Sequence, residues 1–112
     1  MSVRDTAAII QTSTNEKSVA LKISMALLES KKAACVHISE AESFYSYQGK
    51  IVNDKEFVLT IKTMKSRVID AMAIIKANHN YHLPEIIEIN IDEASSEYFA
   101  WLSKETAKQV AN

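Results

Sequence analysis

A single glycine, Gly49, and a single proline, Pro84, are the only strong chain-breaking residues in this sequence of 112 residues. Because tight turns depend heavily on these two residue types, their scarcity predicts few turns and long regular elements. The single glycine also excludes the glycine-rich phosphate loops, both the dinucleotide fingerprint and the P-loop. The chain is therefore predicted to consist of a few long helices and strands.

The bulk composition predicts one soluble globular domain that covers residues 1–112. Hydrophobic residues make up 47% of the sequence, charged residues 24%, and the net charge is −1. Such a chain has no basic excess with which to neutralise a nucleic-acid backbone. It also has neither a run of about 18 apolar residues nor the long apolar core of a signal peptide. We therefore expect a cytoplasmic protein without a nucleic-acid or membrane partner.

Hydrophobic periodicity predicts the order strand, helix, strand, strand, helix, strand, with a further helix at the end. Strands are expected over residues 6–12, from 33 towards a turn at Gln48–Gly49, over 56–63 and over 85–91. Helices are expected from a capping box at Ser13 and Glu16 to about residue 31, from Ser66 to about Asn78, and from Ser95 or Ser96 onwards. This order is typical of the α+β class: a ferredoxin-like βαββαβ antiparallel sheet with an additional C-terminal helix.

The same periodicity assigns side chains to faces of the sheet and helices. Expected aligned sets on the strands are Phe57, Leu59 and Ile61, and Ile87, Ile89 and Ile91. Expected buried helix faces are Val19, Ala20, Ile23, Ala26 and Leu27; Val68, Ile69, Met72 and Ile75; and Tyr98, Trp101 and Leu102. The second sheet face keeps Val58, Thr60, Ile86, Cys35 and tyrosines, and the last helix and further copies of the chain are expected to cover it.

Five motifs, in order and at matching spacing, resemble the CutA divalent-cation tolerance family. They are AACV at 33–36, FYSYQGK at 44–50, EFVLTIKT at 56–63, HNYHLPEI at 79–86 and YFAWL at 98–102. The resemblance extends from about Thr12 to Thr106. It implies a homotrimer with strands paired between subunits, and a connection to copper and other divalent metals without an established enzymatic reaction.

The sequence departs from the family pattern at positions that bear on metal binding. Gln11–Thr12 stands where many members have a Cys-Thr pair, so a thiol proposed as a copper ligand in some members is absent. Asn78–His79 stands where some members have two adjacent histidines. Thr14 and Asn80 replace prolines, Tyr47 a tryptophan and His37 an asparagine. These departures leave the fold prediction intact and weaken the metal prediction.

His79, His82 and Cys35 are the candidate metal ligands. Imidazole is the commonest protein ligand for copper and zinc, and thiolate suits soft metals. The α-carbons of the two histidines would be ~10 Å apart in extended chain, so they meet on one ion only if the loop folds back. Alternatively, the histidines belong to a polar connector and Cys35 is a small buried hydrophobe. Cys35 shares a strand face with His37, so the two are also a possible pair.

The resemblance also implies that the Lys62–Thr63 pair lies near a polar cleft shared by subunits. Tyr81 and Glu85 are further candidates for this cleft, and the three residues are the only features that would support an enzyme with a site at the subunit boundary. A small anion could bind Lys62 there; alternatively, Lys62 is solvated or paired with an acidic residue such as Glu56 or Glu85. Tyr81 and the hairpin tyrosines either stack on a ligand or pack at subunit contacts, where tyrosine is favoured.

The sequence therefore predicts a trimeric, non-enzymatic CutA-like protein that binds copper or another divalent ion. No nucleophile, base and acid stand at a recognised spacing, so no catalytic residue is assigned. No metal is expected to be required for folding, and three copies could supply the ligands that one lacks. The alternative is a trimeric signalling or scaffold module that senses small anions or nucleotides, related in architecture to PII-type proteins. No protein partner other than the chain itself is identified.

Overall fold

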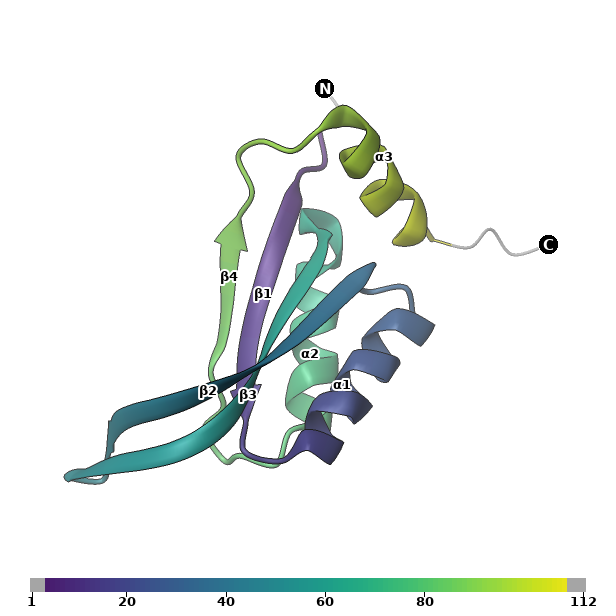
Figure 1. Ribbon diagram of the computed structural model, residues 1–112. Helices are drawn as coiled ribbons and strands as arrows, with labels where there is room; N and C mark the ends of the chain where they lie inside the picture. Colours follow the sequence, from purple (N-terminus) through teal and green to yellow (C-terminus); the bar gives the residue numbers. More distant parts are fainter. Residues whose placement is uncertain (1–3, 109–112) are drawn as a thin grey trace.

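The computed structural model describes residues 4–108 as a four-stranded antiparallel sheet with two helices on one face and a third helix at one end (Figure 1). The strands are β1 (Ala7–Thr14), β2 (Cys35–Tyr47), β3 (Lys50–Met64) and β4 (Ile86–Asn90); the helices are α1 (Lys17–Glu29), α2 (Val68–Asn78) and α3 (Ser96–Glu105), with a short 3-10 turn, η1 (Lys65–Arg67), before α2. The strand order β2-β3-β1-β4 and the antiparallel pairing confirm the ferredoxin-like α+β prediction.

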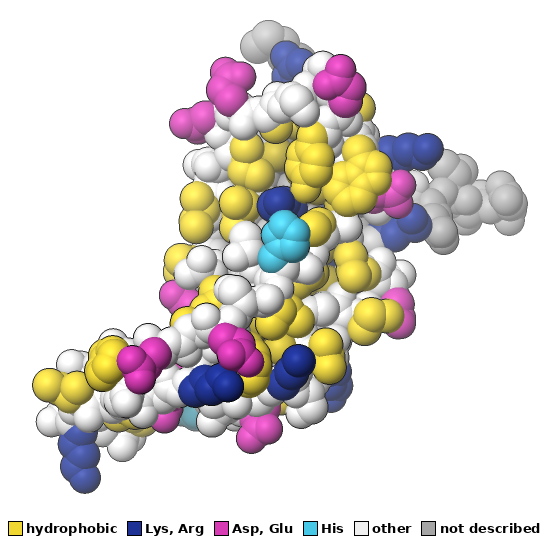
Figure 2. All heavy atoms as spheres, viewed as in Figure 1, with side chains coloured by type: hydrophobic (Ala, Val, Ile, Leu, Met, Phe, Trp, Pro, Cys, Tyr) yellow, Lys and Arg dark blue, Asp and Glu magenta, His cyan; other side chains and the backbone are white. Residues whose placement is uncertain are grey.

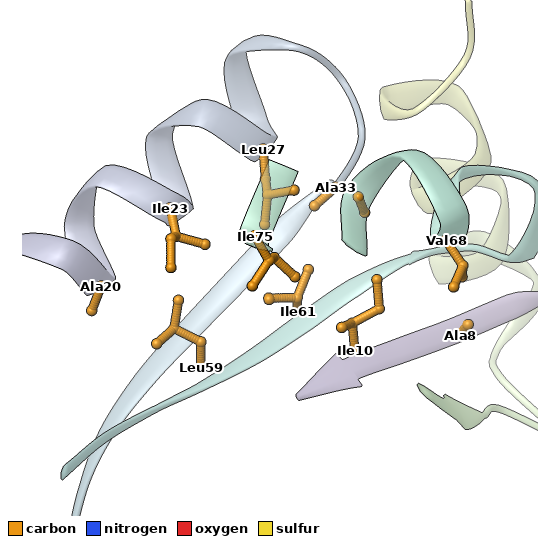
Figure 3. Packing of buried hydrophobic residues seen from close by; sticks show 11 residues of the cluster. Ala8, Ile10, Ala20, Ile23, Leu27, Ala33, Leu59, Ile61, Val68 and Ile75 are labelled. Carbon is orange, nitrogen blue, oxygen red and sulfur yellow. The ribbon is translucent and has the colours of Figure 1, made fainter. Parts of the chain in front are cut away.

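The main hydrophobic core lies between the sheet and the helices α1 and α2 (Figure 3). Ile10, Leu59 and Ile61 from the two central strands are fully buried against Ile23 and Leu27 of α1. Phe57, Val36 and Ile38 pack at the margin of this core, as the alternation of the strands predicts. Burial of these aliphatic side chains is the principal stabilising contribution to the fold.

A second, smaller cluster joins α3 to the end of the sheet. Leu102 is fully buried against Ala7 and Met64, and Phe99 packs beside it. Phe99 and Leu102 are three residues apart and form the buried stripe of the helix. Tyr98 and Trp101 lie beside that stripe and remain 36% and 41% exposed, so the prediction that both point inward is wrong. Ser95 caps α3 by accepting a hydrogen bond from the Tyr98 amide at 3.3 Å.

The strands β2 and β3 form a long hairpin that projects beyond the helices (Figure 1). Gln48 and Gly49 join them, with φ of 51° and 79° respectively, as a two-residue turn whose twist matches that of the strands. This confirms the predicted turn. Near the tip, Phe44 and Ile51 are exposed because neither helix reaches this part of the sheet.

The outer face of the sheet, opposite α1 and α2, is termed the open face. The pairing of Gln11 with Ile87 and of Ile9 with Ile89 places both β4 isoleucines on this face, where they are 43% and 44% exposed. Ile86 instead packs against the main core. The prediction for β4 therefore had the two faces reversed: both Ile86 and Ile87 are apolar, and only pairing with β1 decides which is buried. Figure 2 shows hydrophobic side chains gathered in the upper part of the molecule, around a basic side chain and a histidine.

Helix starts and one helix face also differ from the sequence prediction. Ser13 belongs to β1, and α1 begins after Glu16, whose amide donates to Thr14 Oγ1 at 3.2 Å. Ser66 lies in η1, where its amide and hydroxyl donate to the Asp5 carboxylate, so it does not cap α2. Ile69 points to solvent, because Val68, Ala71 and Ile75 form the buried stripe of α2 at helical spacing.

Two isoleucines of α2 give a matched test of this packing. Ile75 is 0% exposed and Ile69 is 83% exposed. Ile75→Ala is expected to lower the free energy of unfolding by ~2–5 kcal/mol, because it leaves a cavity in the core. Ile69→Ala is expected to change it by no more than about 0.5 kcal/mol. Denaturant unfolding of both variants measures the difference, and equal losses would contradict the assigned helix face.

Candidate functional site

The segment between α2 and β4 is held to the sheet by His79. Its Nε2–H donates to the Ser13 carbonyl at 2.9 Å, and its Nδ1 accepts a hydrogen bond from the Tyr81 amide at 3.1 Å. The rings of His79 and Tyr81 lie 5.0 Å apart. Nearby, the Thr14 hydroxyl donates to Asn80 Oδ1 at 2.6 Å, which adds a second tie to the end of β1. The loop is therefore fixed by side chains despite its irregular backbone.

The fixed loop and the inner side of the hairpin enclose a cleft of about 740 Å³. The lining residues come from β1, the hairpin and the loop: Gln11, Ser13, Ser43, Phe44, Tyr45, Ser46, Tyr47, Glu56, Val58, Asn80, Tyr81, His82, Leu83 and Glu85. Four of these described residues are aromatic and two are carboxylates, and none of them is a lysine or an arginine. Its volume is typical of a small-molecule site.

Glu56 is the most deeply placed carboxylate of the cleft, only 6% exposed. The Tyr81 hydroxyl donates to Glu56 Oε2 at 2.7 Å. Burial, together with this hydrogen bond and the charge of Glu56, raises the pKa of Tyr81 above its usual range, so Tyr81 stays protonated and a donor. The hydrogen bond to Asp54 raises the pKa of Tyr45 to about 12, so Tyr45 is also a neutral donor.

The structure brings Tyr81 and Glu85 together in the cleft but places Lys62 elsewhere. Glu85 Oε2 accepts a hydrogen bond from the Ser13 hydroxyl at 3.3 Å. Lys62 pairs across the strands with Cys35, and its Nζ lies 5.6 Å from the centre of the Tyr98 ring, beside α3. Ion pairs between described residues join Lys32 to Asp70, Lys55 to Glu40 and Lys65 to Glu88, so Lys62 is paired with neither Glu56 nor Glu85.

The three predicted metal ligands lie apart. Cys35 is half-buried on the open face, with its Sγ 3.7 Å from His37 Nε2, which confirms that this pair can form. His82 is exposed at the rim of the cleft, and His79 already uses both ring nitrogens. Within residues 4–108, histidine, cysteine and acidic side chains nowhere gather in a group of three that could hold a metal ion. The described residues of one chain therefore do not provide a complete metal site.

Sequence reasoning missed Glu56 as a member of the cleft and considered it only as a partner for Lys62. Alternation along β3 places Glu56 on the same face as Val58 and Thr60, so its face was predictable. The contact between Glu56 and Tyr81 was not predictable from the sequence, because it depends on how the loop folds back over the sheet.

Comparison with known proteins identifies the family. The sequence model of the CutA1 divalent ion tolerance protein family matches residues 8–105. The divalent-cation tolerance protein CutA of Pyrococcus horikoshii is 34% identical over 100 residues, which are 89% of this chain and 98% of that protein. The crystal structure of CutA1 from Ehrlichia chaffeensis superposes with a TM-score of 0.88 at 32% identity, over 95% of this chain and 100% of that one. This chain therefore belongs to the CutA1 divalent ion tolerance protein family.

Two further relatives correct the expected cytoplasmic location. A periplasmic CutA from Archaeoglobus fulgidus has a TM-score of 0.88 at 31% identity, over 90% of this chain and 99% of that one. A chloroplastic CutA of Arabidopsis thaliana is 37% identical over 86 residues, which are 76% of this chain and 47% of that protein. Family membership thus does not imply the cytoplasm. Across residues 4–108, every helix is too short or too polar to cross a membrane.

The double hydrogen bonding of His79 predicts a pH-dependent stability. Partial burial lowers the pKa of His79 below its usual value of 6.5, although the Ser13 carbonyl and Glu56 oppose this shift. The contribution of His79 to the free energy of unfolding should be complete above pH 6.5 and lost as the pH falls towards its lower folded-state pKa. In that pH range the unfolded chain binds more protons than the folded chain. Protonation of Nδ1 would also break the bond from the Tyr81 amide.

The free energy of unfolding should therefore fall more steeply between pH 7 and pH 5 for the wild type than for His79→Gln. Glutamine retains an N–H donor for Ser13 and does not titrate. For a single proton, the slopes of the two pH profiles can differ by no more than about 1.4 kcal/mol per pH unit. The variant His82→Gln controls for the loss of any imidazole. Parallel pH profiles for the wild type and His79→Gln would contradict the structural role of His79.

Proposed function

We propose that this protein is a homotrimer that binds copper or another divalent metal ion without catalysis, at sites completed between subunits. The observation that carries the proposal is the Cys35–His37 pair, with Sγ and Nε2 3.7 Å apart on the open face. Two soft or borderline donors suit copper or zinc but leave coordination positions unfilled. Further donors must then come from another copy of the chain.

Self-association is supported by what the open face exposes. Ile87 and Ile89 form an apolar strip on β4, an edge strand of the sheet. On the helix-side face, the projecting hairpin also exposes Phe44 and Ile51 beyond the reach of the helices. Contiguous apolar surface and unpaired strand edges are unfavourable in water and are typically covered by a partner. Copies of the same chain are the simplest partner, because strand edges can pair symmetrically.

The geometry changes the relative weight of the proposed ligands. His79 would have to break a bond to Ser13 or Tyr81 before it could bind a metal ion. His82 is exposed and free of such a constraint among the described residues, and Cys35 already lies beside a second donor. We therefore propose Cys35 and His37 of one copy, together with His82 of another, as the ligands, and His79 as a structural residue that positions the loop of His82.

The alternative function, sensing of small anions or nucleotides, gains no support. It required Lys62 to act in the cleft, but Lys62 lies beside Tyr98, and none of the lining residues that the structure describes is a lysine or an arginine. The relatives quoted above carry CutA names. Divalent-cation tolerance, the role those names state for the Pyrococcus horikoshii and Archaeoglobus fulgidus proteins, is the function that we propose for this chain.

Calorimetric titration of the reduced protein with copper and zinc at neutral pH tests this proposal. Cys35→Ser and His82→Ala are each expected to weaken binding about tenfold or more, because removing a donor leaves an incomplete coordination shell. Ser39→Ala, on the same strand and face as Cys35, is the matched control and should bind as the wild type does. Equal affinity in all four proteins, or no saturable heat with the wild type, would contradict the proposal.

A further inference from the structure

We propose that helix α1 is a docking surface for an acidic amphipathic helix of a partner protein. The surface is a row of three apolar side chains on α1, Leu21, Met25 and Leu28, which are 50%, 53% and 37% exposed and are termed the outer stripe. It belongs to the helical layer rather than to the open face or the hairpin, and Figure 1 shows α1 on the side of the molecule away from β4. The proposal goes beyond metal tolerance and depends on neither Cys35 nor a bound metal.

The core of the domain does not account for the outer stripe. Ala20, Ile23 and Leu27 already form the side of α1 that packs against the sheet, and all three are fully buried. A helix on the surface of a globular domain typically has one apolar stripe and polar residues elsewhere. A second apolar row, exposed to water, is unfavourable unless another molecule covers it.

The spacing of the outer stripe is that of a coiled-coil seam. Leu21, Met25 and Leu28 are separated by four and then three residues, which corresponds to heptad positions d, a and d. Side chains at these positions insert between the side chains of a second helix that lies along the first. Because α1 has 13 residues, it is about 20 Å long and offers such a helix nearly two heptads of contact.

The charges beside the outer stripe indicate the sign of the partner. In the same heptad register, Lys17 takes position g, and Lys22 and Glu29 take position e. Among the described residues, neither Lys17 nor Lys22 forms an ion pair. Acidic side chains that flank the apolar stripe of a partner helix would pair with these two lysines. A parallel second copy of α1 would instead place Lys17 opposite Lys22, which is repulsive, so a different and acidic helix fits better.

The test is fluorescence anisotropy of labelled synthetic helices, titrated with the assembled protein as purified. The acidic probe is a peptide of about three heptads with leucine at positions a and d and glutamate at e and g. The basic probe differs only in having lysine at e and g. The acidic probe should bind saturably, about tenfold or more tightly than the basic probe, and its affinity should fall with added salt. Equal binding of the two probes, or binding of neither, would overturn the proposal.

Matched variants locate the surface. Met25→Gln keeps a good helix former but places a polar side chain at the centre of the outer stripe, so it should weaken binding of the acidic probe about tenfold. Ile69→Gln removes exposed apolar surface from α2, outside the stripe, and should leave the affinity unchanged. Both side chains are exposed, so both variants should fold as the wild type does. Unchanged affinity in Met25→Gln, or an equal loss in both variants, would overturn the proposal.

Reversal of one flanking charge tests the sign of the partner. Lys22→Glu should weaken binding of the acidic probe and strengthen binding of the basic probe, because it replaces an attraction by a repulsion at one position e. Glutamate and lysine have similar helix propensities, so α1 itself should be unaffected. An unchanged ratio of the two affinities would show that charge does not select the partner, and would overturn the proposal.

Two further measurements distinguish other occupants of the outer stripe. If a second copy of the chain bound there, the mass from light scattering would rise with concentration beyond that of the assembled protein, and Met25→Gln would prevent the rise. If an anionic membrane bound there, the wild type would sediment with phosphatidylglycerol vesicles and Met25→Gln would not. Neither behaviour is expected, and either one would overturn the assignment of a partner helix.

Discussion

The structure depends on a sheet that is covered by helices on one face only. On the helical side, Ile10, Leu59 and Ile61 are fully removed from water by α1 and α2. On the other side, α3 covers only one end, and β4 exposes Ile87 and Ile89. Because a single copy cannot bury both faces, the folded chain retains apolar surface that favours association. The projecting hairpin exposes further apolar side chains, Phe44 and Ile51, on its helix-side face beyond the reach of the helices.

The two candidate sites follow from this one-sided arrangement. The Cys35–His37 pair lies on the open face, where a second copy could complete the coordination of a metal ion. The cleft forms where the loop of residues 79–85, tied to β1 by His79, meets the inner side of the hairpin. The Cys35–His37 pair offers a soft thiol and an imidazole but too few donors for a full coordination shell, whereas the lining of the cleft is acidic and aromatic. Both features therefore lie on surfaces that the proposed self-association would cover.

Local patterns were sufficient to predict the order of elements, the turn at Gln48–Gly49 and the buried set around Leu59, because each depends on short-range periodicity. They failed where adjacent apolar residues compete, as with Ile86 and Ile87, since only strand pairing decides which one is buried. The contact of Tyr81 with Glu56 joins positions 25 residues apart and depends on the tertiary fold. The cleft could therefore be predicted only in part, from Tyr81 and Glu85.

The mass of the protein in solution tests the central claim most directly, namely that copies of the chain cover the open face. Light scattering at micromolar concentration should return about three times the 12.5 kDa mass of one chain. Replacement of Ile89 by lysine on the open face should shift that mass downwards, because it places a charge in the apolar contact. A stably folded wild-type species of 12.5 kDa at that concentration would contradict the account.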